Sequence, residues 1–309
     1  MLLSDVSHMC VNVHPKPADV CAVITTFRPD DRFPDRVRIV RGQVGAVVII
    51  NDGECGDNIQ KLNHWFEGQS NVFLHHNPRN MGVAASLNAG LSIARSRGCQ
   101  WVLTLDDDSL VRRDMVQRLI NWLQSNPFSK PIGIIGMSWV APGDIGKLKL
   151  NGDKGTYREL RGIITSGSFF RVATYDRIGP FRDEFYVDFV DIDYCLRARR
   201  KGLAVIRLNE AGFLHIIGNS RVVRVMGIGI VVEDQQPFRV YYGYRNSTVL
   251  ALEHWKREPL YALAIVLNHV RKFFRIILFE KNKTGKLVHA ATGIRDGWKR
   301  KLGKVKNPS

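Results

Sequence analysis

Three consecutive carboxylates follow a hydrophobic run in the stretch WVLTLDDDSL. The apolar residues 101–105 are typical of a buried strand, and Asp106, Asp107 and Asp108 come directly after it. Side chains two residues apart on an extended chain point to the same side, so the spacing of Asp106 and Asp108 suits one oxygen on a metal and one on an adjacent sugar hydroxyl. Clustered oxygen ligands of this kind suit Mg²⁺ or Mn²⁺. A helix start with an N-cap and acidic first turn explains the same residues without a metal, so both interpretations stay open.

Polar residues also follow other predicted strands. Asp52 comes just after residues 45–50, and the stretch NPRNMGVAASLNAGL at 77–91 places Asn80 and Gly82 before a predicted helix. Turn and capping preferences explain most of these residues one by one. Their common position is more informative, because open α/β sheets bind ligands beyond the carboxyl ends of their strands.

A second acidic group lies in EFYVDFVDIDYCLRARRKGL at residues 184–203. Asp188, Asp191 and Asp193 precede or begin a predicted helix whose far end is rich in arginine, an order that the helix dipole alone favours. A carboxylate here could also act as a general base toward an acceptor hydroxyl. His215, in GFLHIIGNS, is by itself typical of a satisfied core histidine, although its imidazole could complete a metal's coordination.

The elements that must position these residues alternate between strand and helix. This order predicts an α/β fold with a mostly parallel sheet flanked by helices. The strands are expected at residues 20–27, 45–50, 71–75 and 100–105, and the helices between them at 56–67, 83–97 and 112–124.

The second half of the chain has a looser pattern. We expect a strand at residues 162–171, a helix at 190–201 that ends at Gly202, a strand at 203–208, and helices at 239–256 and 259–279. Residues 219–237 mix glycine, valine and charge without a clear period, which predicts a mobile loop.

The chain of 309 residues carries a formal net charge of +16, which points to an anionic partner. Residues 259–309 contain twelve Lys and Arg against two acids and so hold +10 of that charge. The five cysteines are scattered without a C-x-x-C pair, which indicates reduced thiols in a cytosolic protein. We expect no signal peptide and no membrane span, because no apolar run reaches 18 residues.

The basic tail begins with an amphipathic pattern. An apolar stripe at helical spacing opposes a polar stripe, and such a basic helix suits an anionic membrane face. Packing of its first half on the catalytic domain is an equally good explanation, whereas the lysine-rich end has little to pack against. The apolar stripe consists of Leu263, Val266, Leu267, Val270, Phe274, Ile277 and Leu278, and the polar one of Asn268, Arg271, Lys272 and Arg275.

Taken in order, these motifs resemble the family-2 glycosyltransferases of GT-A fold, and most of all bacterial rhamnosyltransferases of O-antigen and cell-surface polysaccharide synthesis. The motifs are the strand followed by NDG, then NPRNMG with a later NAG, LDDDS, DFVDIDYCLRARRKG and a following histidine with glycine. The resemblance covers about residues 19–256, with a weaker echo in GIRDGWKRKLGK. Related rhamnosyltransferases often carry another residue where this chain has Asp107, which leaves the outer aspartates intact.

The resemblance implies a domain organisation and roles for the residues. Residues 1–18 would be an extension and 19–256 the catalytic domain, divided into a nucleotide-binding half (19–140) and an acceptor-binding half (141–256). Residues 257–309 would form a basic helical region that associates with membrane. Asp191 would be the catalytic base and Asp108 and His215 metal contacts. The donor side would comprise Thr25, Thr26, Asp52, Asn80, Gly82, Asp106 and Asp107, and the acceptor side Asp188, Asp193, Ser166 and Gly167.

The activity implied is an inverting, Mg²⁺- or Mn²⁺-dependent transfer of a sugar. The favoured sugar is L-rhamnose, with dTDP-rhamnose as the donor. The acceptor would be a lipid-diphosphate-linked saccharide at the inner face of the cytoplasmic membrane, and a homo-oligomer is possible. A galactofuranosyl or other hexosyl transferase that uses a UDP-sugar is the alternative. A basic nucleic-acid-binding protein is a third class. It is disfavoured because the positive charge gathers in one amphipathic tail, and the sequence contains no nucleic-acid-binding motif.

Overall fold

The computed structural model describes residues 15–53, 56–141, 155–215, 221–225 and 228–305. The extension expected at residues 1–18 therefore lies mostly outside the described part. Two of the five cysteines, Cys10 and Cys55, also lie outside it. Cys21 and Cys195 are buried free thiols, and Cys99 is a half-buried one.

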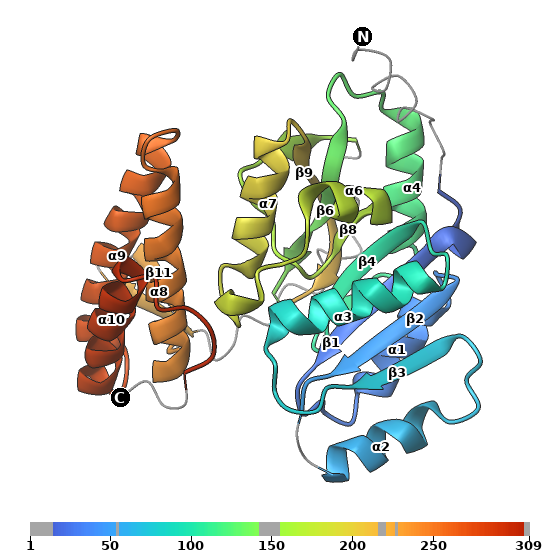
Figure 1. The fold of residues 1–309 in the computed structure, drawn as a ribbon, viewed down its shortest axis with the longest axis horizontal. Helices are drawn as coiled ribbons and strands as arrows, with labels where there is room; N and C mark the ends of the chain where they lie inside the picture. Colours follow the sequence, from blue (N-terminus) through green and yellow to red (C-terminus); the bar gives the residue numbers. More distant parts are fainter. Residues whose placement is uncertain (1–14, 54–55, 142–154, 216–220, 226–227, 306–309) are drawn as a thin grey trace.

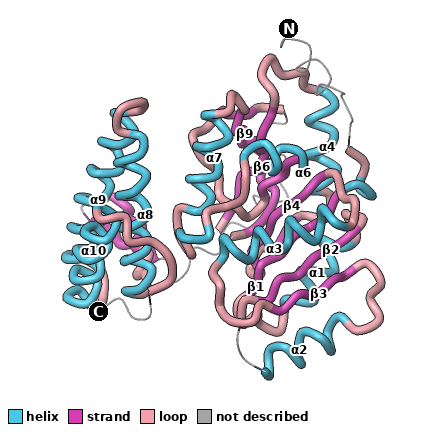
Figure 2. The backbone as a smooth tube through the Cα atoms, viewed as in Figure 1, coloured by secondary structure: helices cyan, strands magenta, loops and turns pink. Residues whose placement is uncertain are grey.

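A large mixed sheet forms the centre of the molecule (Figures 1 and 2). Within the described residues its strands pair in the order β3-β2-β1-β4-β8-β6-β9-β5, and β7 pairs with β9. Neighbours among β1 to β4 are parallel, as are β6 and β9, whereas β8 runs antiparallel to β4 and β6. The strands are β1 Val20–Thr26, β2 Ala46–Asn51, β3 Val72–His76, β4 Trp101–Asp106, β5 Leu110–Val111, β6 Ile132–Val140, β7 Tyr157–Glu159, β8 Ser168–Arg171 and β9 Ala204–Leu214.

Helices cover both faces of this sheet, and alternate residues of each buried strand supply the two apolar cores. One core joins the sheet to α1 (Phe33–Arg41), α2 (Gly56–Phe66) and α4 (Met115–Ser125). The other joins it to α3 (Val83–Ser96), α6 (Val172–Ile178) and α7 (Val190–Arg200). Strands β1, β2 and β4 are buried on both faces, which explains their continuous apolar runs.

Three long helices form a bundle beside the sheet (Figure 1). They are α8 (Pro237–His254), α9 (Pro259–Phe279) and α10 (Lys283–Trp298). Buried apolar residues of α8 and α9 belong to the same core cluster as α7, so the bundle is packed against the catalytic part. The predicted helix at residues 259–279 matches α9 at both ends.

Several predictions for the second half of the chain were wrong. The strand expected at 162–171 begins only at Ser168, because Gly167 adopts a φ of 80° that turns the backbone into the sheet. Strand β9 continues to Leu214, since β5 and β6 both pair with its last residues. Part of the expected mobile loop at 219–237 is an antiparallel hairpin, β10 (Arg221–Val225) with β11 (Ile228–Val232).

The lysine-rich end also has a packing partner that the sequence pattern did not reveal. Helix α10 packs along α8, and two of its glycines lie against the backbone of α8. A Cβ on Gly293 would come within 2.5 Å of the Tyr241 carbonyl oxygen, and one on Gly297 within 2.5 Å of the Arg245 carbonyl oxygen. Close backbone approach of this kind requires glycine, so this helix belongs to the folded bundle.

No helix in the described part of the chain is long and apolar enough to cross a membrane.

Candidate active site

Asp108 and His215, the two expected metal contacts, lie close together, and Asp106, which was expected on the donor side, lies beside them. Asp106 ends β4 and Asp108 follows it, while His215 comes directly after β9. The pairing of Leu110 with Leu214 brings the ends of these two segments together. One ligand atom from each of Asp106, Asp108 and His215 lies within 4.8 Å of the others, and the Asp108 Oδ1 to His215 Nδ1 distance is 3.7 Å.

The chemistry of this cluster fits a divalent cation. Burial, and next the charges of Asp108, Asp107 and Asp191, raise the pKa of Asp106 to about 7. Burial also lowers the pKa of His215, which favours the neutral imidazole that binds metals. Asp108 Oδ1 and His215 Nδ1 are buried and accept or donate no hydrogen bond to any described residue. A cation with oxygen and nitrogen ligands would relieve both the charge repulsion and the missing contacts.

The middle carboxylate has a different task. Asp107 Oδ2 accepts hydrogen bonds from Thr26 Oγ1 (2.7 Å) and from the Phe27 backbone N–H (3.1 Å). Arg36 Nε donates to its backbone oxygen at 2.6 Å. Asp107 therefore fastens the end of β4 to the end of β1 and points away from the cluster. Of the three aspartates, Asp106 and Asp108 face His215, and Asp107 has a structural role.

The donor-side residues gather at the same edge of the sheet. The register pairs Thr25 with Asp106 across β1 and β4. Asp52, after β2, accepts hydrogen bonds from Asn77 Nδ2 (2.8 Å), Met81 N (2.7 Å) and Gly82 N (2.8 Å). The carboxylate thus shapes the loop before α3, and its assignment as the partner of the nucleobase stays a prediction.

Asn80 and Gly82 contact the turn before α7 and the C-terminal segment. Tyr186 Oη donates to Asn80 Oδ1 at 2.6 Å, and Lys304 Nζ donates to the Asn80 carbonyl oxygen at 2.8 Å. Gly82 has a φ of 89°, and a Cβ there would lie 2.3 Å from the Tyr186 ring. The loop between β3 and α3 therefore contacts both the turn before α7 and the C-terminal segment.

Ser166 and Gly167 hold the segment that carries Asp106. Ser166 Oγ accepts a hydrogen bond from Asp106 N at 3.2 Å and lies 2.6 Å from Ser109 Oγ. The Gly167 N–H donates to the Thr104 carbonyl oxygen at 2.8 Å. Ser166 is buried at 2% exposure, so in this structure both residues hold the end of β4. Their predicted contact with the acceptor remains a prediction.

The three acids near α7 face different surroundings. Asp191, in the first turn of α7, lines a cavity together with Asp188. Asp193 lines a separate cavity on the side of α7 that faces α8. Burial is the main cause that raises the pKa of Asp191 to about 6, and the charge of Asp188 contributes. A carboxyl with this pKa is ionised at neutral pH yet basic enough to accept a proton.

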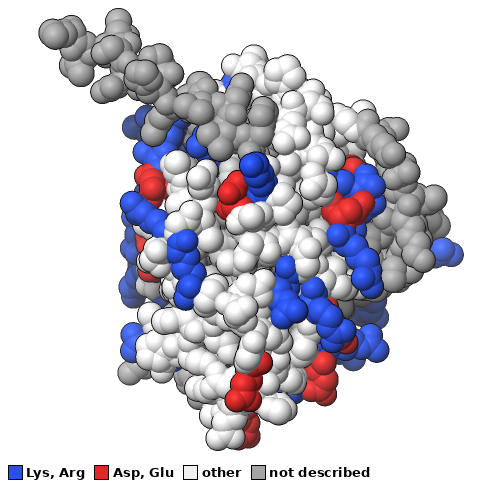
Figure 3. Space-filling model, turned by 90° about the vertical axis from the view of Figure 1, so that its right-hand side faces the viewer, with Lys and Arg blue, Asp and Glu red and all other residues white. Residues whose placement is uncertain are grey.

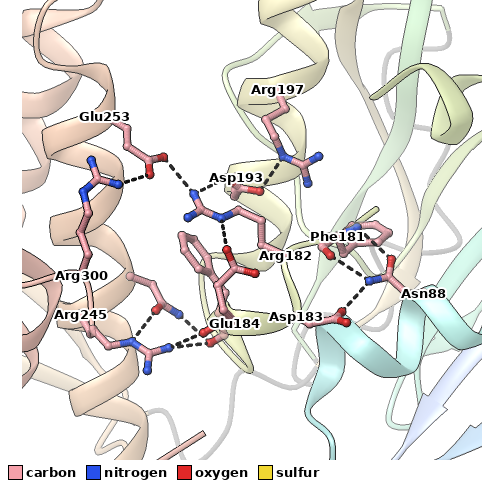
Figure 4. A network of polar contacts seen from close by, with 12 residues as sticks. Asn88, Phe181, Arg182, Asp183, Glu184, Asp193, Arg197, Arg245, Glu253 and Arg300 are labelled. Atoms are coloured by element: carbon pink, nitrogen blue, oxygen red, sulfur yellow. Dashed lines mark hydrogen bonds and ion pairs between the residues drawn. The ribbon is translucent and has the colours of Figure 1, made fainter. Parts of the chain in front are cut away.

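Asp193 belongs to a structural ion-pair network that ties α7 to the bundle (Figure 4). It accepts from Arg197 Nε at 2.8 Å and from Arg182 Nη1 at 3.4 Å. Arg182 also donates to Glu253 of α8 at 2.9 Å, and Glu253 in turn pairs with Arg300 at 3.0 Å. Asp193 therefore takes part in the packing of α7 on the bundle and lines another cavity than Asp191, and its expected place on the acceptor side stays a prediction.

A strained turn precedes Asp191, and two buried residues of α8 hold it. Tyr186, Asp188 and Phe189 all have positive φ, at 63°, 58° and 62°. Asn246 Nδ2 donates to the carbonyl oxygens of residues 185, 187 and 188 at 2.9, 2.8 and 2.8 Å. Arg245 donates to those of 184, 185 and 303 at 2.9, 3.2 and 2.6 Å (Figure 4). Such strain persists only where its surroundings fix it.

The sequence analysis did not identify Arg239, Arg245 or Asn246 as residues of the site. Arg239 Nη2 donates to Asp188 Oδ1 at 2.6 Å, and its charge lowers the pKa of both Asp106 and His215. Arg239 therefore lies between the acidic cluster and the acceptor-side turn. The signal that could have found it is QPFRVYYGYRN, in which a proline opens a helix and an arginine, then an Arg-Asn pair, follow.

Comparison with known proteins decides the family. The family model for Glycosyl transferase family 2 matches residues 21–175, from β1 into α6, and this span holds Asp52, Asp106 and Asp108. The chain belongs to glycosyl transferase family 2. It is similar to the dTDP-rhamnosyl transferase RfbF of Shigella flexneri, with 24% identity over 278 residues that cover 86% of this chain and 90% of that protein.

Solved glycosyltransferase structures confirm the predicted GT-A fold. TarS 1-349 of S. aureus in complex with UDP-GlcNAc has a TM-score of 0.58 and 14% identity, over 90% of this chain and 80% of that one. The mannosyltransferase PcManGT from Pyrobaculum calidifontis, in complex with GDP-Man and Mn²⁺, has a TM-score of 0.58 and 13% identity over 94% and 78%. Against a longer TarS chain the match spans 48% of that chain. The protein is a glycosyltransferase.

Proposed function

We propose that this glycosyltransferase is an inverting, metal-dependent enzyme that transfers a sugar from a nucleoside diphosphate to a lipid-linked saccharide. The observation that carries the proposal is the cluster of Asp106, Asp108 and His215 at one edge of the sheet, with Asp191 on the neighbouring acceptor side. Hard ligands for a diphosphate-bound cation and a separate basic carboxylate are the two components that such a transfer needs.

Asp106, Asp108 and His215 would hold the cation, which supplies positive charge opposite the diphosphate and stabilises it as a leaving group. Arg239 would add a fixed positive charge at the same place, because it already lies within electrostatic range of Asp106 and His215. Thr25 and the loop that carries Asn80 and Gly82 would border the ribose and the diphosphate.

Asp191 would accept the proton of the acceptor hydroxyl. The hydroxyl oxygen forms a bond to the anomeric carbon as the bond from that carbon to the diphosphate oxygen breaks, so the configuration inverts. The proton ends on the Asp191 carboxylate and the electron pair of the broken bond leaves with the nucleoside diphosphate. Asp188 and Arg239 would fix the turn that presents the acceptor to Asp191.

The similarity to RfbF supports dTDP-rhamnose as the first donor to test, and the fold shared with UDP- and GDP-sugar complexes keeps other donors as the alternative. A panel of dTDP-rhamnose, UDP-hexoses, UDP-galactofuranose and GDP-mannose, each with Mn²⁺, Mg²⁺ or a chelator, tests the proposal by thermal stabilisation and donor turnover. We expect one nucleotide sugar to stabilise the protein and to be turned over only with metal. Turnover of none of them, or equal turnover in chelator, would contradict it.

The bundle supports a membrane surface as partner. On α9 the apolar side chains point outward, at 48 to 61% exposure for Leu263, Leu267, Phe274 and Leu278. Some polar side chains of α9 turn inward, as His269 lies 2.7 Å from Ser247 and Lys272 bonds to Gln235 at 2.7 Å, whereas Asn268 and Arg271 are exposed. Helix α9 thus leaves many apolar side chains exposed although Ala262, Ile265 and Ile276 are buried, and a large exposed apolar face marks an interaction site.

The charge around this face favours an anionic bilayer over another protein. The two acids of the described residues 259–305, Glu280 and Asp296, are buried at 4% and 6% exposure. The exposed charges of α9, α10 and the turn between them are therefore all positive, among them Arg271, Lys281 and Lys283. On the face turned away from the bundle, by contrast, basic and acidic groups are scattered among uncharged areas (Figure 3). Basic residues beside an apolar face are the signature of interfacial helices on anionic lipid.

Sedimentation with vesicles tests this part of the proposal without disturbing the fold. The triple variant Leu263→Ser, Leu267→Ser and Phe274→Ser removes exposed apolar groups only. We expect it to lose most binding to phosphatidylglycerol vesicles, while a matched variant on the exposed face of α4, Gln117→Ser with Asn121→Ser, keeps it. Equal binding by both variants, or equal binding to neutral vesicles, would refute the membrane assignment.

A further inference from the structure

A cavity of about 190 Å³ lies beside Asp191 and receives part of its wall from the C-terminal bundle. The turn and first residues of α7 supply Asp188, Asp191 and their neighbours. Gln235 comes from the segment before α8, Gly243 from α8 itself, and Lys272 from α9. The helices that present the apolar outer face therefore also complete the space next to the proposed base.

Lys272 reaches this cavity from the inner side of α9. Its Nζ donates a hydrogen bond to Gln235 Oε1 at 2.7 Å and lies 5.6 Å from the centre of the Tyr244 ring. A Cβ on Gly243 would lie 3.6 Å from the same Nζ, so a longer side chain at that position would cover the ammonium group. Glycine at 243 keeps the ammonium accessible from the cavity.

The ammonium of Lys272 has no counter-ion of its own. Among the described residues it forms no ion pair within 4.0 Å, and the carboxylates near it are matched to other cations. Asp188 pairs with Arg239 at 2.6 Å, and Glu280 pairs with Lys286 at 2.9 Å. Burial accordingly lowers the pKa of Lys272. A partly buried ammonium without an ion-pair partner is costly, and an anionic ligand would offset that cost.

We propose that Lys272 binds a phosphate group of the acceptor, so that the bundle contributes a specificity-determining residue to the active site. The inference rests on the proposed glycosyl transfer and adds the chemistry of the acceptor. Lys272 lines the cavity of Asp191 and Asp188, and that cavity's lining includes none of Asp106, Asp108 and His215, which places the group on the acceptor side. A diphosphate carried by a membrane lipid would approach α9 from its apolar face and meet this ammonium on the inner side.

Calorimetry on the full chain tests the proposal, with the donor side first saturated by dTDP or UDP and Mn²⁺. The probes are a short-chain prenyl diphosphate, the matching prenyl alcohol and inorganic pyrophosphate. The variants are Lys272→Met and Lys272→Arg, and the control is Lys256→Met, since Lys256 is an exposed lysine next to the same bundle. Thermal melting of each variant confirms that it is folded.

We expect the wild-type chain to bind the prenyl diphosphate and pyrophosphate. It should bind the prenyl alcohol at least tenfold more weakly than the prenyl diphosphate. Lys272→Met should weaken diphosphate binding tenfold or more, the scale of one charge-assisted hydrogen bond. Lys272→Arg should recover most of it and Lys256→Met should bind as wild type. A preference for prenyl diphosphate over pyrophosphate identifies a lipid source, and equal affinities identify the phosphate alone.

Two results would overturn the inference. One is diphosphate binding that Lys272→Met leaves unchanged, and the other is an alcohol that binds as tightly as the diphosphate. Failure of the wild-type chain to bind dTDP or UDP with Mn²⁺ in the first step is a separate outcome, because it contradicts the proposed glycosyl transfer before any acceptor probe is added.

Discussion

The acid limb of the pH-rate profile should report the ionisation of Asp191. Only its carboxylate form can accept a proton, so the rate rises as pH rises through the pKa, which burial places at about 6. With donor and metal saturating, kcat should be about half of its plateau at pH 6 and about a tenth at pH 5, as a single titration requires. Asp191→Asn should lower kcat by about 10² or more with donor affinity retained.

Neighbouring acids sharpen this test. The charge of Asp188 helps to raise the pKa of Asp191, so Asp188→Asn should move the acid limb to lower pH. Asp193→Asn is the matched control and should leave the limb in place, because Asp193 lies in another cavity, paired with arginines. Initial rates of transfer, measured between about pH 4.5 and 8 for the wild-type chain and each variant, give the position of the acid limb. A flat profile, or full loss in Asp188→Asn with near-normal turnover in Asp191→Asn, would refute the assignment.

Two further predictions concern the elements that support the site. Asn246→Ala removes the side-chain amide that contacts three carbonyl oxygens of the turn and should lower the free energy of unfolding by about 3 kcal/mol in urea titration. The exposed control Asn121→Ala should stay within about 0.5 kcal/mol, and equal effects would contradict the role of Asn246. Asp193→Asn should lower stability through its arginine partners yet keep more turnover than Asp191→Asn, and the reverse order in a steady-state assay would argue against this division.

Local patterns were enough to predict the half of the site that follows strand ends. Asp52 and Asp106 lie at the edge where a parallel sheet collects its carboxyl ends, because β1, β2 and β4 are buried, β-branched and regularly spaced. Helical geometry also separates Asp191 from Asp193, because two residues along a helix differ by about 200° in direction. In both cases the periodicity of one element determines the direction of the side chain.

Residues that depend on contacts between distant segments could not be predicted in this way. Arg239 reaches Asp188 only because α8 packs against the turn, and Lys272 faces inward because it lies on the side of α9 that packs against α8. Helical periodicity defined the two stripes of α9 but carries no information on which stripe faces the protein. The separate role of Asp107 could not be predicted either, since its hydrogen bond with Thr26 joins the ends of two strands, β1 and β4, that are far apart in the sequence.

The most direct measurement is the affinity of dTDP and UDP by calorimetry with Mn²⁺ and with a chelator, for the wild-type chain and for Asp108→Asn. The account predicts tight binding that requires metal, and a loss of about tenfold or more in Asp108→Asn, which removes one charged ligand from the cluster with Asp106 and His215. The same affinity in chelator, or an unaffected Asp108→Asn variant, would contradict the claim that these three residues hold the cation of a nucleotide-sugar site.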